Sequence, residues 1–320
     1  MPNCPVCGNS EDKHREVHIS SFNNQEYKLY ECSKCGLHWW EPLKIIPEFY
    51  EGEGSELYEI FHIGARAELP PHTPPFFRYF PKKSGMLLDI GCGDGVFLKF
   101  ARDLGFEVWG IDFDCKSIRL CQEKQNLKNT YCASPEEFAE FCQREGLKFD
   151  VIIFFEVLEH QDKPVAFMEA IKSMLKEEGF IAGSVPNRES WITKKGWGRD
   201  KITDFPPHHF LRFSKVSLKN FLSMEGFKDI FIMDNTDIKA LTPYFQVLLI
   251  GNRANKFLAK NLLTSKDSST NTSKEISLIK KGIYKGLRLI RFLALLPITI
   301  PAKFLIEGPH LYFHAKLDRK

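Results

Sequence analysis

The sequence predicts an α/β fold with a doubly wound sheet, preceded by a small cysteine-rich module. Two stretches predict the sheet: the apolar residues 86–90 run into a glycine-rich loop, and the apolar residues 151–155 end abruptly in titratable side chains. Short apolar runs bounded in this way are typical of strands buried on both faces, and ligands bind where such strands end. The third observation is a pair of CxxCG motifs near the N-terminus.

The composition is that of a folded protein. Of the 320 residues, 43% are hydrophobic and 27% are charged, which excludes a disordered chain. The first residues contain no apolar segment of the secretory type, so we expect a cytoplasmic, reducing location. We therefore expect the nine cysteines to be thiols or metal ligands and not disulfides.

The charge is unevenly distributed along the chain. The net charge is +3, but the basic residues gather after residue 239 and the part that precedes them is acidic. An enzyme that acts on RNA is expected to carry positive charge around its catalytic cleft. The distribution therefore argues against nucleic acid as the substrate.

Residues 1–42 are predicted to form a zinc ribbon. Cys4 and Cys7 in CPVCG, and Cys32 and Cys35 in CSKCG, each place two thiolates on a tight turn whose glycine permits a positive φ. Two such turns close a tetrahedral Zn²⁺ site, and the zinc is structural because all four ligands come from the protein. The alternative is four thiols that pair by chance.

Residues 43–84 are predicted to form a connector rich in proline and aromatic residues. Short helical pieces are expected at residues 45–54 and 56–68. Tyr50, Tyr58 and Phe61 could fold over a ligand cleft as a lid, but we favour packing against the main domain.

The next segment has the pattern of a nucleoside-binding unit. The strand at residues 86–90 is followed by Gly91, Gly93 and Gly95 and then by a helix from about residue 96, so the backbone can approach a ligand at a helix N-terminus. The following strand ends at Asp112, close to the interval at which an acidic side chain accepts hydrogen bonds from a ribose diol. A structural unit without a ligand is the alternative.

Acidic residues in and before the glycine loop narrow the choice of cofactor. Asp89 and Asp94 would repel a pyrophosphate, whereas they suit a cofactor with an ammonium and a sulfonium. The stretch LLDIGCGDG resembles motif I of the class I S-adenosylmethionine-dependent methyltransferases. The similarity continues through GIDFD, FDVIIFFEVLEH, GFIAGSVPN and residues 208–230, and so covers about residues 87–230. A ribbon ahead of such a core also resembles a recurrent architecture of that superfamily.

This resemblance implies the domain plan and the cofactor site. It implies a Rossmann-like sheet in a core at residues 85–238, an insertion at residues 239–306 and an antiparallel last strand at residues 307–320. The implied cofactor contacts are Gly91, Gly93 and Gly95 on the methionine moiety, Asp89 near its amino group, Asp112 on the ribose hydroxyls, and Phe113 and Ser134 near the adenine. At Ala133 and Ser134 the family often has an acidic residue, which this sequence lacks.

The stretch EVLEH places three titratable residues after the fourth strand. On the first turns of a helix, Glu156, Glu159 and His160 would share one face at the mouth of the cofactor cleft. Glu156 could contact the cofactor while Glu159 and His160 form a local pair, or His160 could be the general base for a hydroxyl acceptor. A third interpretation is a divalent cation site completed by His208 or His209.

The spacing of this stretch resembles metal-assisted O-methyltransferases of the terminal-ribose RNA and polyprenyl-catechol types. The resemblance implies Mg²⁺ on Glu156, Glu159, His160 and His209, with Glu156 and His160 as the catalytic residues. The aromatic and basic residues 191–205 are expected to form a variable substrate loop.

The insertion ends in a basic and then apolar segment, residues 276–306. Its uncharged stretch, residues 292–302, contains two prolines and is too short to span a bilayer. Peripheral contact with an anionic membrane, a helical cap on the substrate pocket and a dimer contact are the alternatives.

Together these observations predict an S-adenosylmethionine-dependent methyltransferase (EC 2.1.1.-) acting on a small-molecule or lipid-linked acceptor, at oxygen. The expected cofactors are S-adenosylmethionine, structural Zn²⁺ and Mg²⁺. Two other functions remain open at this stage: an RNA methyltransferase whose ribbon grips the nucleic acid, and a catalytically inactive cofactor-binding protein that acts on a partner.

Overall fold

A computed structural model describes residues 2–10, 12–51, 68–190, 204–235, 297 and 307–318 of the chain. Residues 1–188, 199–235 and 310–320 form one compact unit, and the remaining residues form a second one.

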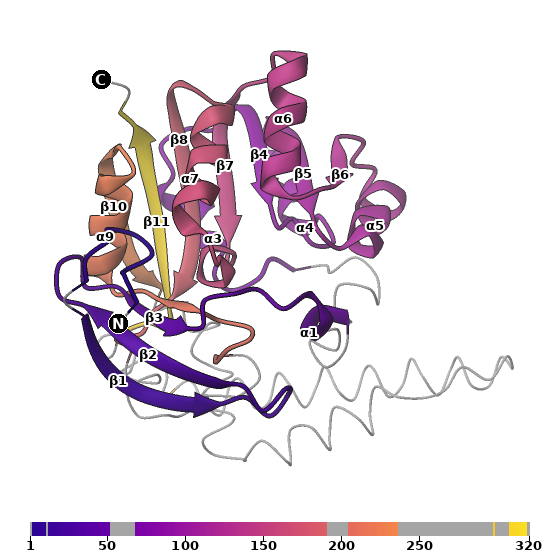
Figure 1. The fold of residues 1–320 in the computed structure, drawn as a ribbon. Coiled ribbons are helices and arrows are strands. Elements are labelled where there is room, and N and C mark those ends of the chain that lie inside the picture. The colour runs from indigo at the N-terminus through magenta and orange to yellow at the C-terminus, as the bar shows by residue number, and fades with distance from the viewer. Residues whose placement is uncertain are drawn as a thin grey trace, which may run out of the picture. The chain divides into compact units, whose positions relative to one another are not determined.

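The centre of the first unit is a seven-stranded sheet in the order β10-β11-β8-β7-β4-β5-β6 (Figure 1). The strands are β4 (Gly85–Ile90), β5 (Phe106–Asp112), β6 (Thr130–Cys132), β7 (Phe149–Phe155), β8 (Leu175–Pro186), β10 (Phe227–Asn235) and β11 (His310–Leu317). Strands β6, β5, β4, β7 and β8 pair in parallel, while β11 runs antiparallel to both β8 and β10. The predicted α/β fold, a mainly parallel sheet with an antiparallel last strand, is confirmed.

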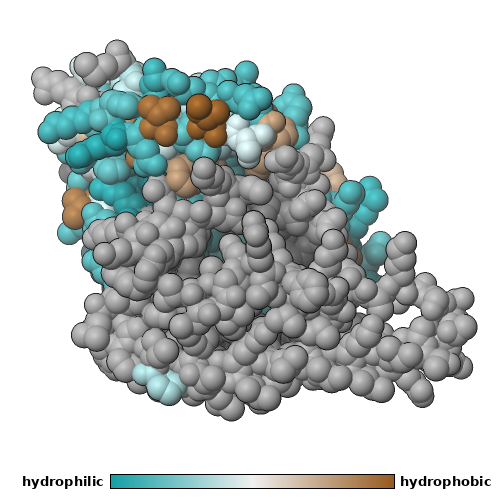
Figure 2. All heavy atoms as spheres, turned by 90° about the horizontal axis from the view of Figure 1, so that it is seen from below, coloured by the Kyte–Doolittle hydropathy of each residue, from teal (hydrophilic) through white to brown (hydrophobic). Residues whose placement is uncertain are grey.

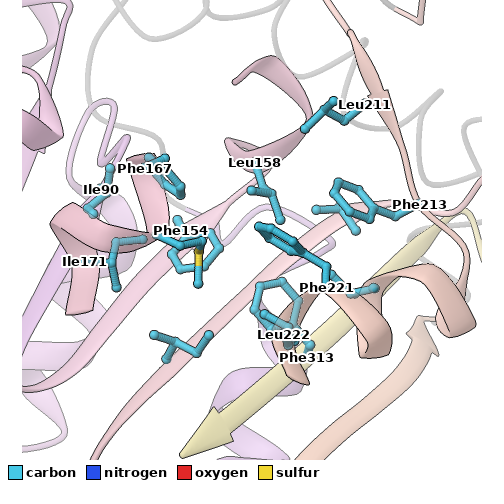
Figure 3. Packing of buried hydrophobic residues seen from close by; sticks show 14 of the residues in the cluster. Ile90, Phe154, Leu158, Phe167, Ile171, Leu211, Phe213, Phe221, Leu222 and Phe313 are labelled. Carbon is cyan, nitrogen blue, oxygen red and sulfur yellow. The ribbon is translucent and has the colours of Figure 1, made fainter. Parts of the chain in front are cut away.

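Helices cover both faces of the sheet because the strand residues alternate between two apolar clusters. On one face pack α6 (Pro135–Glu145), α7 (Pro164–Met174) and α9 (Lys215–Met224). On the other pack α3 (Pro74–Tyr79), α4 (Val96–Asp103) and α5 (Cys115–Gln125). In the first cluster Leu158 lies between the phenylalanines Phe154 and Phe213 (Figure 3). The loop after β7 is therefore anchored in the core next to the site described below.

The N-terminal segment forms a second sheet that includes a strand from the core. Strands β1 (Asp12–Ile19), β2 (Glu26–Cys32) and β3 (His38–Glu41) pair antiparallel, and β3 also pairs with β9 (Leu211–Arg212). Trp39 and Trp40 of β3 are fully buried. The ribbon and the core thus share one sheet and one apolar cluster.

The connector is described only in part. Helix α1 (Pro47–Glu51) follows the ribbon and lies within the first of the two expected helical pieces. Phe76 of α3 and the following Phe80 pack onto the core. Tyr58, Phe61, residues 191–203 and nearly all of the insertion at residues 239–306 lie outside the described residues. Within the described residues, no helix has the length and apolarity needed to cross a membrane.

Viewed from below, the visible part of the described residues is mostly hydrophilic, with a few apolar side chains between the polar ones (Figure 2). Among the exposed apolar residues is Phe113, whose exposed fraction is 58%. Phe113 directly follows β5 and lines the cavity at the ends of the parallel strands.

One expectation about the cysteines was wrong. Cys115, at the start of α5, and Cys132, at the end of β6, form a disulfide. The ends of two adjacent parallel strands bring these residues together with a Cα–Cα distance of 5.0 Å, within the normal range for a disulfide. The other seven cysteines are free.

Candidate functional site

A cavity of about 1230 Å³ opens where the parallel strands β4, β5, β6 and β7 end. Its walls come from the loops that follow these strands, from the residues before α3 and from α1. From β4 the strand order runs to β5 and β6 on one side, whereas β7 lies on the other side of β4. Open α/β sheets bind ligands at such a point, where the strand order reverses. The volume is ample for a nucleoside-bearing cofactor together with a second small molecule.

The glycine loop forms one wall. Gly91 and Gly93 line the cavity with φ of 78° and 53°, and a Cβ on Gly91 would lie 2.7 Å from Val157. Glycine is required there because other residues are strained at such angles. Gly95 is different: it caps α4 at φ 74° and faces the core, where a Cβ would meet Leu127 at 2.6 Å. Gly95 does not line the cavity, so its predicted role in cofactor contact is corrected to close packing.

Asp112 holds the loop in shape. Its two carboxylate oxygens accept hydrogen bonds from the backbone N–H of Gly93 at 2.8 Å and of Asp114 at 2.9 Å. Burial raises the pKa of Asp112 to about 6, although these backbone hydrogen bonds favour the charged form. Each oxygen keeps a second lone pair, so the carboxylate can still accept from a ligand hydroxyl.

Asp89 lines the cavity beside Asp112. It is 3% exposed, and burial, with the nearby charge of Asp112, raises its pKa well above the ordinary value. Two buried carboxylates on one wall are costly without a cationic or hydrogen-bonding partner. The site is thus suited to a ligand with an ammonium group and a diol.

Aromatic and polar residues line the far end of the cavity. Phe113 and Ser134 both lie on its wall, where sequence analysis expected the adenine. Tyr50 of α1 adds a second ring, 5.6 Å from that of Phe113 and in an edge-on arrangement. The disulfide Cys115–Cys132 ties together the two loops that carry Phe113 and Ser134.

The stretch after β7 departs from the predicted helix. Residues Leu158–His160 form a single 3₁₀ turn, and α7 begins only at Pro164. Glu156 has φ 55°, in the left-handed region, which sends its side chain away from those that follow. Glu156, Glu159 and His160 therefore do not share one face, and the predicted four-ligand cation site with His209 is corrected. The residues divide into two clusters.

The first cluster surrounds Glu159, whose side chain is fully buried. One carboxylate oxygen lies 3.9 Å from Nε2 of His160 and 3.9 Å from Nε2 of His209, and both oxygens are without a hydrogen-bond partner among the described residues. Nδ1 of His160 donates to the backbone carbonyl of His208 at 2.7 Å, which leaves Nε2 as the unprotonated nitrogen. Burial lowers the pKa of His160 to about 3 and raises that of Glu159 well above its ordinary value.

This arrangement brings acceptor atoms together in a buried space. A carboxylate and an imidazole lone pair repel each other unless a proton or a cation lies between them. Oxygen and imidazole nitrogen are ligands that divalent cations accept, and a second residue, Asp204, lies 3.9 Å from Nδ1 of His209. Ring nitrogens of His160, His208 and His209 lie within 4.8 Å of one another, and the Glu159 carboxylate lies beside two of these rings. This cluster therefore fits a divalent cation, whereas Glu156 is outside it.

The second cluster contains residues that sequence analysis missed. Oε2 of Glu156 lies 3.1 Å from Nδ1 of His310 on β11, and Oε1 accepts from the hydroxyl of Ser184 on β8 at 2.6 Å. His72, from the loop before α3, completes the group. An available signal was the predicted last strand: an antiparallel strand begins at the edge where its parallel neighbours end, so a histidine at its start lies near the site.

The ribbon has a site of its own. The Sγ atoms of Cys4 and Cys35 are 3.6 Å apart and those of Cys7 and Cys32 are 3.4 Å apart, and all four lie within 4.8 Å of one another. These separations fit tetrahedral zinc with Zn–S bonds of about 2.3 Å.

The ribbon also holds the loop that carries His208 and His209. The backbone N–H of Trp40 on β3 donates to the carbonyl of Phe210 at 3.0 Å, and the N–H of Phe210 donates to the carbonyl of Glu159 at 2.9 Å. Strand pairing of Trp39 with Leu211 continues this contact. The first cluster is thus built jointly by the loop after β7 and a loop fixed by the ribbon.

Known proteins resemble this chain in sequence. The family described as "Methyltransferase domain" matches residues 63–230, which is more than half of the chain. A protein of Bartonella tribocorum named ubiquinone biosynthesis O-methyltransferase is 34% identical over 200 residues, which cover 60% of this chain and 78% of that protein. A protein of the same name from Paraburkholderia phytofirmans is 29% identical over 168 residues, and this chain spans only 65% of its length.

A solved structure, a SAM-dependent methyltransferase from Archaeoglobus fulgidus, aligns over 84% of this chain and 98% of its own, with 21% identity and a TM-score of 0.44. The match over residues 63–230 includes the glycine loop, Asp112 and every member of the two titratable clusters except His310. On this sequence match, the chain belongs to the methyltransferase domain family.

Proposed function

We propose that this protein transfers a methyl group from S-adenosylmethionine to a hydroxyl of a small or lipid-linked acceptor. The observation that carries the proposal is one cavity whose wall holds Asp89, Asp112 and His160, the last of which belongs to the buried cluster with Glu159 and His209. The first pair suits the cofactor, and the second suits the activation of an oxygen acceptor. The names of the curated relatives support oxygen as the acceptor atom.

The roles of the chain's own residues follow from their positions. Asp112 would accept from the ribose hydroxyls, Asp89 would face the amino group, Gly91 and Gly93 would let the backbone approach, and Phe113 and Ser134 would border the adenine. When bound, S-adenosylmethionine supplies a methyl group on a sulfur that is already an activated leaving group. The protein therefore has to orient the acceptor, exclude water and remove a proton.

The proposal includes two metal sites. A divalent cation such as Mg²⁺ would be held by Glu159, His160 and His209, where it would favour the ionised form of an acceptor hydroxyl. Zinc would be held by the four cysteines of the ribbon and would keep β3 in place beside β9. His160, with its low pKa and its Nδ1 committed to a carbonyl, is then a ligand and not the general base that sequence analysis considered.

A direct test uses the full chain loaded with one zinc and S-adenosylmethionine labelled in the methyl group. The acceptors are catechol, a prenylated catechol and matched compounds in which both hydroxyls are already methylated. Label in the catechols and not in the methylated compounds, together with loss of transfer in Asp112→Ala, supports the proposal. Cofactor binding by calorimetry without transfer to any hydroxyl compound contradicts it.

A further inference from the structure

The second titratable cluster has no role in the function proposed so far. Glu156 and His72 line the cavity, and His310 stands beside them at the start of the last strand. One ring nitrogen of each histidine and one oxygen of Glu156 lie within 4.8 Å of one another. The cluster comes from three separate parts of the chain, so its assembly depends on the finished fold.

Glu156 is held firmly in this cluster. Its backbone N–H donates to the carbonyl of Ser184 at 2.9 Å, and the Ser184 hydroxyl donates to its Oε1 at 2.6 Å. These two contacts hold Glu156 at φ 55°, in the left-handed region, where a residue other than glycine is strained. Strain of this kind persists where the surrounding structure enforces it, and it is concentrated at functional sites.

The remaining oxygen of Glu156 orients His310. The distance from Oε2 to Nδ1 is 3.1 Å, and an ionised carboxylate can only accept, so Nδ1 carries the proton. Burial alone would raise the pKa of Glu156 and lower that of His310, but their mutual attraction reverses both, so the pKa of Glu156 is lowered and that of His310 is raised. Nε2 is therefore the nitrogen of His310 without a proton, it has no hydrogen-bond partner among the described residues, and the ring is more basic than an ordinary histidine.

The loop with His72 is fixed against the same strand. Asn235 of β10 is paired with His310 of β11, and its side-chain amide donates to the carbonyl of Pro71 at 2.6 Å. The His72 and His310 rings are 5.6 Å apart, and an electrostatic interaction with His72 adds to the causes that lower the pKa of Glu156. The titratable groups described around His310 are thus Glu156 from β7 and His72 from this loop.

The carboxylates of the two clusters differ in exposure. The side chain of Glu156 keeps 21% of its surface exposed, whereas that of Glu159 keeps none. Oε2 of Glu156 already accepts from Nδ1 of His310, so a metal ion bound between these two atoms would have to replace the proton that they share. A carboxylate that orients a histidine whose other nitrogen is free is the arrangement of a general base.

We propose that His310, oriented by Glu156, is the general base that takes the proton from the acceptor hydroxyl; this rests on the proposed O-methyl transfer. In the step, the hydroxyl proton passes to Nε2 of His310 and the oxygen forms a bond to the methyl carbon. The bond from that carbon to sulfur breaks, and the electron pair stays on sulfur. Nδ1–H remains hydrogen bonded to Glu156, a positioning residue, which stabilises the imidazolium.

The test compares acceptors that need a base with one that does not. His310→Gln keeps a side chain able to donate to Glu156 but cannot take up the proton. Its turnover with catechol should fall by about 10²-fold or more, the usual contribution of a general base. With 4-nitrocatechol, which is already ionised at neutral pH, turnover should stay within a few-fold of wild type. His314→Gln is the matched control, because His314 lies on the same strand and packs against Phe80 and Phe231.

Equal losses with both acceptors, or no loss with either, overturn the proposal. So does the loss of a bound divalent cation from His310→Gln, because it would make His310 a ligand. A second readout needs no acceptor: NMR titration of labelled histidines should show the pKa of His310 falling in Glu156→Gln. If the pKa of His310 does not fall, the proposed pairing of Glu156 with His310 is wrong. This result does not depend on an acceptor, so it can be told apart from a failure of the proposed function, in which wild type methylates no hydroxyl compound.

Discussion

The isosteric change Asp112→Asn should make the cofactor-free protein more stable at neutral pH while weakening cofactor binding. The folded state raises the pKa of Asp112 from an ordinary value of 3.8 to about 6, mainly by burial. At about 1.4 kcal/mol per pH unit, the wild-type carboxylate contributes roughly 3 kcal/mol less stability at pH 7 than below pH 3.8. The sign follows because a raised pKa in the folded state favours folding at low pH, and this advantage is lost as the pH rises through 6.

Asparagine resembles the protonated aspartic acid, with one acceptor oxygen and one donor group in place of two acceptors. The variant should therefore match wild type near pH 4 and exceed its free energy of unfolding by up to about 3 kcal/mol at pH 7. Its affinity for S-adenosylmethionine should fall by about 1–3 kcal/mol, because ribose hydroxyls lose a partner. The wild-type carboxylate would then lower the free energy of unfolding but raise the affinity for the cofactor.

The assay is urea unfolding of the zinc-loaded proteins at pH 5, 6 and 7, with cofactor affinity measured by calorimetry. Asp103→Asn controls for the loss of one carboxylate, since the Asp103 side chain is 59% exposed at the end of α4. The quantity of interest is the difference between variant and wild type, in which effects of pH on the ribbon cancel. A difference that does not change between pH 5 and pH 7 would refute the reasoning.

Three further predictions concern the metal sites and the glycine loop. Glu159→Gln should weaken Mn²⁺ binding by more than the roughly 10–100-fold typical of a residue that only supports a ligand, with cofactor affinity kept; titration by electron paramagnetic resonance checks this. Metal analysis should find one zinc per chain, and the variant Cys32→Ser should lose this zinc. Because β3 would then no longer support β9, turnover should fall more than cofactor affinity does. Unchanged turnover in the zinc-free variant would contradict the link between the ribbon and the site. Gly95→Ala should cost about 1–3 kcal/mol of unfolding free energy, from its positive φ and the contact with Leu127, and should leave the cofactor affinity of the folded fraction unchanged. Loss of that affinity without loss of stability would return Gly95 to the cavity wall.

The sequence was sufficient to predict those elements that are formed by residues close together in the chain. The strand, glycine loop and helix around Gly91, and the strand that ends at Asp112, depend on residues close together in the chain. The paired CxxCG motifs likewise carry their turns within a few residues. These parts could be predicted because periodicity and turn residues determine them.

The arrangement of Glu156 could not be predicted from its spacing. Helical periodicity placed it on the same face as Glu159, but hydrogen bonds to Ser184 hold it in a left-handed conformation that breaks the helix. Its partner His310 lies 154 residues further along the chain. The two-residue strand β9 is equally hard to find, because Leu211 and Arg212 form a strand only through their pairing with β3.

The pairing of β3 with β9 also sets an order on the folding of the chain. Trp39 leaves the ribosome long before Leu211, by roughly 10–30 seconds at about 5–20 residues per second. During that time the tryptophan-bearing edge of β3 has no strand beside it, and open apolar edges are sites of aggregation. A chain interrupted before Leu211 would keep that edge exposed. Once it is made, the short strand β9 covers the open edge of β3 and so removes a site of aggregation that exists during synthesis.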